Sequence, residues 1–148
     1  MRRRRFILAS VAAAAAPLAR AQGVAPAQDI RPIVESITGG ASPEASGVEV
    51  ELAQIAENGN SIPLRVRVPS PMTEAHHVRA VHVIAERNPR PRVATFHFTP
   101  ASGRAEVSSF IRLNGSQRVV AIAELSDGSF WSDAAFIEVR EAACTEDG

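Results

Sequence analysis

The amino-acid sequence predicts an all-β protein, a β-sandwich preceded by one short helix and followed by a short arm. After Gly40 the spacing of apolar residues changes from the 3.6-residue period of helices toward the two-residue period of strands. Turn residues interrupt the remaining chain at intervals of about ten residues, which is typical of sandwiches. The 148 residues, 45% hydrophobic and 22% charged, suit one globular domain.

The first 21 residues are expected to be an export signal. Four arginines at positions 2–5 precede an apolar run over residues 6–18, and Ala19-Arg20-Ala21 supplies the small-x-small pattern that signal peptidase reads. The apolar run is too short to span a bilayer, so no membrane anchor is expected. Because paired arginines stand shortly before Phe6-Ile7, we expect a twin-arginine signal and a periplasmic location, with an ordinary Sec leader as the alternative.

Loss of this leader changes the charge of the chain. It removes five of the 16 arginines and none of the 16 acidic residues, which leaves a formal charge of −5. A net-negative domain lacks the clustered basic charge that binds phosphates, so nucleic-acid binding is excluded. The sequence also has no lysine, which excludes Schiff-base chemistry and a P-loop.

The expected elements follow the leader in order. Residues 22–40 form a flexible segment and a short helix, in which Ile30, Ile33, Val34 and Ile37 share one face, Asp29 is the N-cap and Gly39-Gly40 end the helix. Residues 41–140 form the sandwich and residues 141–148 the flexible arm. Strands are expected over residues 48–52, 62–68, 78–86, 93–99, 105–113, 118–125 and 135–140.

One expected strand is apolar on both of its faces, over residues 119–123. Such a strand lies centrally, with one face on the core and the other against a loop, the helix or a partner. Aromatic side chains often anchor interfaces. The predicted partner surface therefore consists of Val119, Val120, Ile122, Phe130 and Trp131, with core packing of the same residues as the alternative.

Enzyme chemistry finds little support in the sequence. If residues 88–91 form a four-residue hairpin loop, His82 lies opposite His97 and both imidazoles can touch one metal ion. A tight site needs three or four ligands, so a small metal-binding protein is the weakest hypothesis. No Gly-x-Ser-x-Gly nucleophile elbow occurs. We expect a protein that is not an enzyme and has no resident cofactor.

Cys144 is the candidate functional residue. It is the only cysteine and lies four residues from the carboxyl terminus, after the last expected strand. An exposed, odd thiol in an oxidising compartment indicates use as a disulfide partner or a reactive group. A thiol on a flexible end can enter a partner's active site, which suits a carrier of covalently bound intermediates.

Eight segments of the expected domain together form a specific pattern. The most specific of them is Ile55-Ala56-Glu57-Asn58-Gly59-Asn60-Ser61-Ile62-Pro63. The others are residues 38–40, 70–73, 80–89, 96–100, 102–108, 121–124 and 126–131. They cover most of the domain in the order of the chain, and together they resemble SoxY, the sulfur-carrier subunit of the periplasmic thiosulfate-oxidising Sox system.

The resemblance implies an immunoglobulin-like sandwich that pairs with a SoxZ subunit and holds thiosulfate-derived sulfur on Cys144. A haem enzyme, a hydrolase and a sulfane dehydrogenase would dock in turn. Residues Ala142, Ala143 and Thr145 of the arm stand where SoxY arms have glycines. Bulkier residues stiffen the arm, and Glu141, Glu146 and Asp147 disfavour the thiolate. The second hypothesis is therefore a structural subunit that pairs with SoxZ and has a vestigial arm.

Overall fold

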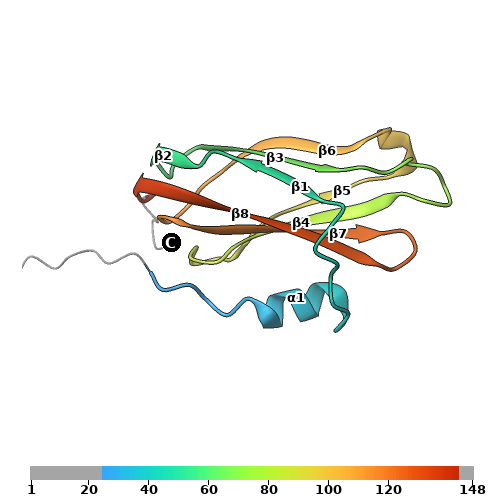
Figure 1. Cartoon of the computed structure of the whole chain (residues 1–148), viewed down its shortest axis with the longest axis horizontal. Helices are drawn as coiled ribbons and strands as arrows, with labels where there is room; N and C mark the ends of the chain where they lie inside the picture. The colour runs from blue at the N-terminus through green and yellow to red at the C-terminus, as the bar shows by residue number, and fades with distance from the viewer. Residues whose placement is uncertain (1–24, 144–148) are drawn as a thin grey trace, which may run out of the picture.

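Two β-sheets pack face to face in the computed structural model, which describes residues 25–143 (Figure 1). The smaller sheet has the strand order β1-β3-β6 and the larger one the order β2-β8-β7-β4-β5. The elements are α1 (Arg31–Thr38), β1 (Glu49–Leu52), β2 (Ile55–Asn58), β3 (Ile62–Val68), β4 (Val78–Ala85), β5 (Arg92–His97), the 3-10 turn η1 (Pro100–Ser102), β6 (Ala105–Ile111), β7 (Gln117–Leu125) and β8 (Phe130–Glu141). This is the predicted all-β, immunoglobulin-like sandwich. The expected export signal lies outside the described residues.

Two strands differ from expectation by more than two residues at an end. β2 was not predicted, because it has only four residues and Ala56 alone turns toward the core, which leaves no visible two-residue period. It pairs in parallel with β8, where Ala56 lies opposite Val139. β8 begins at Phe130 rather than 135, since it pairs with β7 over its whole first half, from Phe130 opposite Glu124 onward. This pairing places β8 between β2 and β7.

The core lies between the two sheets and follows the alternation of the strands. In β3, Leu64, Val66 and Val68 are buried while the arginines between them are exposed, as the sequence predicted. Those arginines pair with acids across the strands: Arg67 Nε donates to Glu49 Oε2 at 2.8 Å. In β7 both faces are covered, because Val119 belongs to the main core and Val120 to a second apolar cluster.

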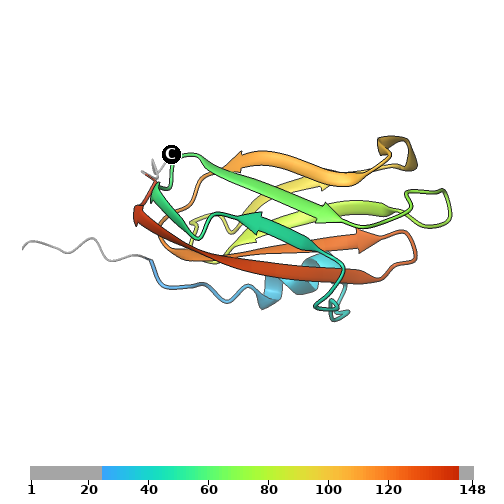
Figure 2. The same cartoon turned by 45° about the horizontal axis from the view of Figure 1, so that its top comes forward.

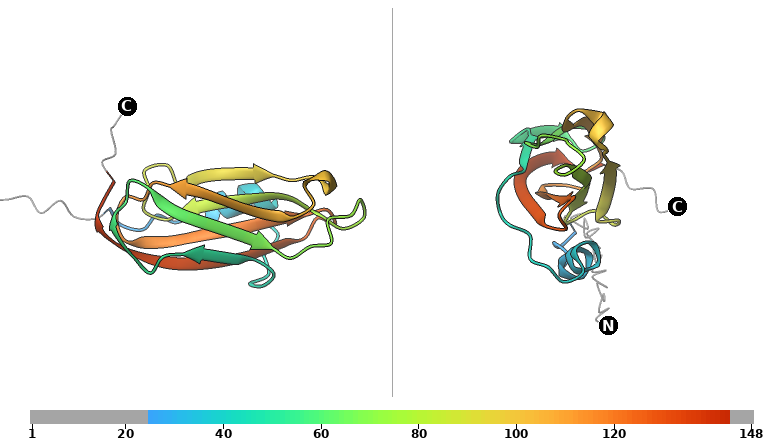
Figure 3. Two further views of the ribbon diagram at one scale, coloured as in Figure 1. Left: turned by 90° about the horizontal axis from the view of Figure 1, so that it is seen from above. Right: turned by 90° about the vertical axis from the view of Figure 1, so that its right-hand side faces the viewer.

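Helix α1 packs on the outer face of the larger sheet (Figure 3). Its Ile33, Val34 and Ile37 contact the cluster of Ile84, Val120 and Ile122. This contact resolves the choice that the sequence left open, since the helix covers the second face of β7.

The cap of α1 differs by one residue from the prediction. Ile30 is the N-cap, and Asp29 precedes it. Asp29 still accepts the Arg31 backbone N–H through Oδ1 at 3.0 Å. Its carboxylate also pairs with the Arg31 guanidinium, and these hydrogen bonds lower the pKa of Asp29 from 3.8 to about 2. The carboxylate therefore satisfies one of the free amides of the first turn. No helix within residues 25–143 has the length and apolar character needed to cross a membrane.

Candidate functional site at the carboxyl end of the sandwich

The described chain ends one residue before the predicted site. Cys144 and Thr145 lie outside the described residues, so the cysteine's placement stays a prediction. Ala142 is exposed, but Ala143 is buried with 4% of its surface exposed. The chain was expected to be free from residue 141 onward. That expectation is wrong for Ala143, which packs against the end of the sandwich.

Backbone hydrogen bonds fasten Ala143 to two neighbouring turns. The Gly59 N–H donates to the Glu141 carbonyl at 2.8 Å, and the Leu113 N–H donates to the Gly59 carbonyl at 2.9 Å. The Ala143 N–H then donates to the Leu113 carbonyl at 3.1 Å. Figure 2 shows the end of β8 beside the turn from β2 to β3. Three segments far apart in the sequence therefore meet at residues 59, 113 and 143.

Gly59 occupies a position where only glycine fits. A Cβ atom added there would lie 2.0 Å from the Leu113 carbonyl oxygen and 2.8 Å from the Ala143 nitrogen. Both contacts are with backbone atoms, which cannot rotate away. The sequence showed Asn58-Gly59-Asn60 only as a turn, and nothing in the local pattern pointed to the chain that crosses it. Gly59 is thus a residue of this site that sequence reasoning missed.

A polar network supports the turn that holds Leu113. Asn88 Oδ1 accepts the Asn114 N–H at 2.9 Å, and Asn88 Nδ2 donates to the Arg112 carbonyl at 2.8 Å. The buried Gln117 donates through Nε2 to Asn88 Oδ1 at 3.0 Å. Its Oε1 accepts the Arg87 N–H at 2.8 Å, so both ends of the buried amide are satisfied. The network fixes residues 112 and 114 on either side of Leu113.

The predicted histidine pair does not form. β4 and β5 pair so that His82 lies opposite Thr95, and His97 lies opposite Ala80. The prediction assumed a four-residue loop over residues 88–91. The loop is longer, since the Ala85 N–H donates to the Pro91 carbonyl, and a bulge follows Val83; together they shift the register by two residues. Residues 25–143 contain no cluster of three or more His, Cys, Asp or Glu side chains placed to hold a metal ion.

His82 lies instead at the outer face of the larger sheet. Its Nδ1 is 3.2 Å from the Thr95 hydroxyl, while its buried Nε2 has no hydrogen-bond partner. Burial lowers the pKa of His82 below the ordinary 6.5, because the charged imidazole loses hydration. Glu124, with Oε2 3.9 Å from Nε2, opposes this shift. Arg92 and His97 lower the pKa further.

The predicted partner surface is only partly accessible. Val119 points into the main core, and Val120 and Ile122 lie in the cluster under α1. These three side chains offer nothing to a partner, which corrects that part of the predicted surface. Phe130 and Trp131 are partly exposed, and their role at an interface stays a prediction. The large apolar side chains most exposed to solvent are Ile55, Phe110 and Phe136.

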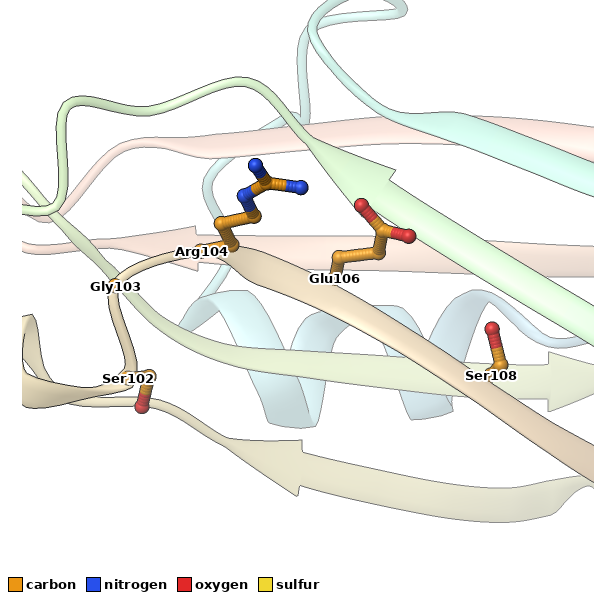
Figure 4. A pocket seen from close by; sticks show the side chains of 5 residues that line it. All are labelled: Ser102, Gly103, Arg104, Glu106 and Ser108. Atoms are coloured by element: carbon orange, nitrogen blue, oxygen red, sulfur yellow. The ribbon is translucent and has the colours of Figure 1, made fainter.

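A separate open hollow lies at the beginning of β6 (Figure 4). Its lining residues are Ser102, Gly103, Arg104, Glu106 and Ser108. Glu106 is already engaged, since Arg65 Nε donates to its Oε1 at 2.8 Å, and this hydrogen bond lowers the pKa of Glu106. The lining extends along β6 only as far as Ser108, about 10 Å before the end of the strand, and includes none of the residues Gly59, Leu113 and Ala143. It is therefore not part of the site around Ala143.

Fold and site together define an immunoglobulin-like β-sandwich whose last described residue is fastened at one end of the sheets. The model of one protein family, sulfur oxidation protein SoxY, matches residues 34–144. The chain belongs to the SoxY family and is a SoxY-like protein of sulfur oxidation. No curated protein matches the chain.

Solved structures share the fold at low sequence identity. The sulfur carrier protein SoxY from Chlorobium limicola f thiosulfatophilum is 22% identical with a TM-score of 0.59, over 73% of this chain and 93% of that chain. Superoxide reductase (neelaredoxin) from Ignicoccus hospitalis is 20% identical with a TM-score of 0.57, over 70% and 91%. A putative superoxide reductase from Thermotoga maritima is 21% identical with a TM-score of 0.56, over 66% and 89%. At this identity the likeness concerns the fold alone.

Proposed function

We propose that this chain is a sulfur carrier, which holds thiosulfate-derived intermediates covalently on Cys144 while partner enzymes act on them. The observation that supports this most directly is the extent of the family match, which runs through residue 144 and so includes the cysteine. The placement of Ala143 also supports the proposal, because the residue that precedes the cysteine lies at one end of the sandwich. The protein acts as a covalent substrate and not as an enzyme.

The chemistry of a thiol suits this task. A Cys144 thiolate and thiosulfate join through a new sulfur–sulfur bond and release two electrons, which a haem enzyme accepts. Water then attacks the terminal sulfonate, releasing sulfate and two protons and leaving a persulfide anion on the cysteine. The remaining sulfane sulfur is the substrate of a dehydrogenase. Sulfur–sulfur bonds form and break through such thiolate steps, so loading is reversible.

We further propose that the carrier works in the periplasm, after export through the leader of residues 1–21, as a heterodimer with a SoxZ-like subunit. The family assignment supports the partner. The arginine-rich start and the apolar run support export. Coexpression of both subunits with one affinity tag, followed by mass measurement of the purified complex, tests the heterodimer. A monomeric carrier that elutes without its subunit contradicts it.

The test of carriage is the mass of the protein after incubation with thiosulfate and the cognate haem enzyme. We expect the mass of one thiosulfate group on Cys144, removed by a thiol reductant, and no addition to the Cys144→Ser variant. An unmodified wild-type chain that still binds its partner subunit would contradict carriage. That result would favour the structural subunit with a vestigial arm.

A further inference from the structure

We propose that Gly59, Leu113 and Ala143 form a clasp that fixes the point from which Cys144 is presented. Gly59 and Ala143 are positioning residues in this proposal, which rests on the proposed carriage of sulfur by Cys144. The clasp keeps the carried sulfur at one end of the sandwich.

Hydrogen bonds and the buried side chain of Leu113 connect the clasp to the core. Both backbone groups of Gly59 form hydrogen bonds, since its N–H donates to the Glu141 carbonyl and its carbonyl accepts the Leu113 N–H. Leu113 likewise uses its N–H for Gly59 and its carbonyl for Ala143, while its side chain is fully buried in the main core. Movement of Ala143 would break a chain of hydrogen bonds that ends in the core.

The side chain of Ala143 adds to this anchoring. Its surface is 4% exposed, although the residue lies beyond the end of β8. A buried methyl group at the end of a chain stabilises the docked position, because it removes apolar surface from water. The side chain and the hydrogen bond together hold the residue that precedes the cysteine.

The clasp shortens the reach of the sulfur. Neighbouring Cα atoms are about 3.8 Å apart, so Sγ of Cys144 stays within about 7 Å of the Ala143 Cα. If the chain were free from Glu141 onward, Sγ would reach about 13 Å from the end of β8. A sulfur so close to the sandwich can meet only an active site that approaches the surrounding turns, residues 58–61 and 112–116.

A nitroxide attached to Cys144, the only cysteine, reports on the clasp through its rotational mobility in the electron paramagnetic resonance spectrum of the mature chain. Ala143→Pro removes the N–H that donates a hydrogen bond to the Leu113 carbonyl. Ala142→Pro is the matched control, because the exposed Ala142 donates no backbone hydrogen bond within the described chain. Trp131 fluorescence checks that each variant is folded.

We expect a slow spectral component in the wild type and in Ala142→Pro. In Ala143→Pro that component should disappear and the rotational correlation time should fall several-fold, to that of a labelled peptide of residues 141–148. Gly59→Ala should act in the same way, since its Cβ displaces the Leu113 and Ala143 backbones. A wild-type label as mobile as the peptide, or equal mobility in both proline variants, would overturn the clasp.

This experiment separates the clasp from the proposed function because it uses neither thiosulfate nor a partner. A slow label on a chain that never takes up thiosulfate refutes carriage and leaves the clasp. A mobile label on a chain that loads normally refutes the clasp alone.

Discussion

The packing of α1 on β7 predicts a large loss of stability for Ile122→Ala. Ile122 is 1% exposed and belongs to the cluster that the helix covers. Removal of buried methyl groups from isoleucine costs about 2–5 kcal/mol, and the cost falls where the surroundings can close the cavity. Ile122 is covered by a single two-turn helix, α1, which can move toward the sheet and reduce the cavity. We therefore expect a loss of about 2–3 kcal/mol in the free energy of unfolding.

Ile137→Ala supplies the comparison, because Ile137 is fully buried in the main core between two sheets. Sheets held by ladders of hydrogen bonds close a cavity less easily, so we expect about 3–5 kcal/mol there. Urea unfolding followed by Trp131 fluorescence measures both losses. At a slope of about 2 kcal/mol/M, the Ile122→Ala midpoint falls by about 1 M or more.

A loss below about 1 kcal/mol for Ile122→Ala would refute the reasoning, provided that the urea slope is unchanged. The outer face of β7 would then be exposed in solution and available to a partner, as the sequence allowed. A loss of the expected size supports the helix as the cover.

Two further predictions concern polar groups. Because burial lowers the pKa of His82 below 6.5, the unfolded chain binds its proton more readily. Stability should then be full above pH 6.5 and fall as the pH decreases toward the folded-state pKa, by at most about 1.4 kcal/mol per pH unit. His82→Gln should remove this part of the pH dependence, whereas His97→Gln, at an exposed position, should retain it. Urea unfolding at several pH values measures this dependence, and the same pH dependence in both variants would contradict the assignment to His82. Asn88→Ala should cost about 2–3 kcal/mol, because the Asn114 N–H and one of the two Gln117 Nε2 hydrogens lose their shared acceptor and the Arg112 carbonyl loses its donor, while Gln117 keeps its bond to the Gly115 carbonyl. A thermal midpoint within about 2 °C of the wild type would contradict that network.

The two-residue spacing of apolar residues predicted most of the strands. It failed where contacts between distant segments decide the structure. β3 was predicted to the residue, since Leu64, Val66 and Val68 alternate with solvent-facing arginines. β2 was not predicted, because its partner, β8, lies some eighty residues away in the sequence and only Ala56 faces the core. The histidine pairing failed because the sequence does not show how long the loop between β4 and β5 is. The longer loop and the bulge after Val83 together shift the register by two residues, which places His82 opposite Thr95.

The candidate site shows the same division. Cys144 was identifiable from its isolation and position, because a single terminal cysteine needs no structure to be noticed. The role of Gly59 depends on a carbonyl 54 residues away and an amide 84 residues away, both within 3 Å of an added Cβ. No local pattern encodes that crossing. Gly59 therefore looked like an ordinary turn glycine.

The alanine before the cysteine acquires a physical meaning from these contacts. The resemblance implies glycine at this position, and glycine retains more backbone freedom than alanine, worth about 0.5–1 kcal/mol against any ordered conformation. Ala143 lowers that cost and adds a buried methyl group, so both effects favour the docked state. Alanine at position 143 thus favours the hydrogen-bonded, buried position that the structure shows for this residue. If the carrier works as proposed, the sulfur is therefore held on the residue that directly follows a fixed point at the end of the sandwich.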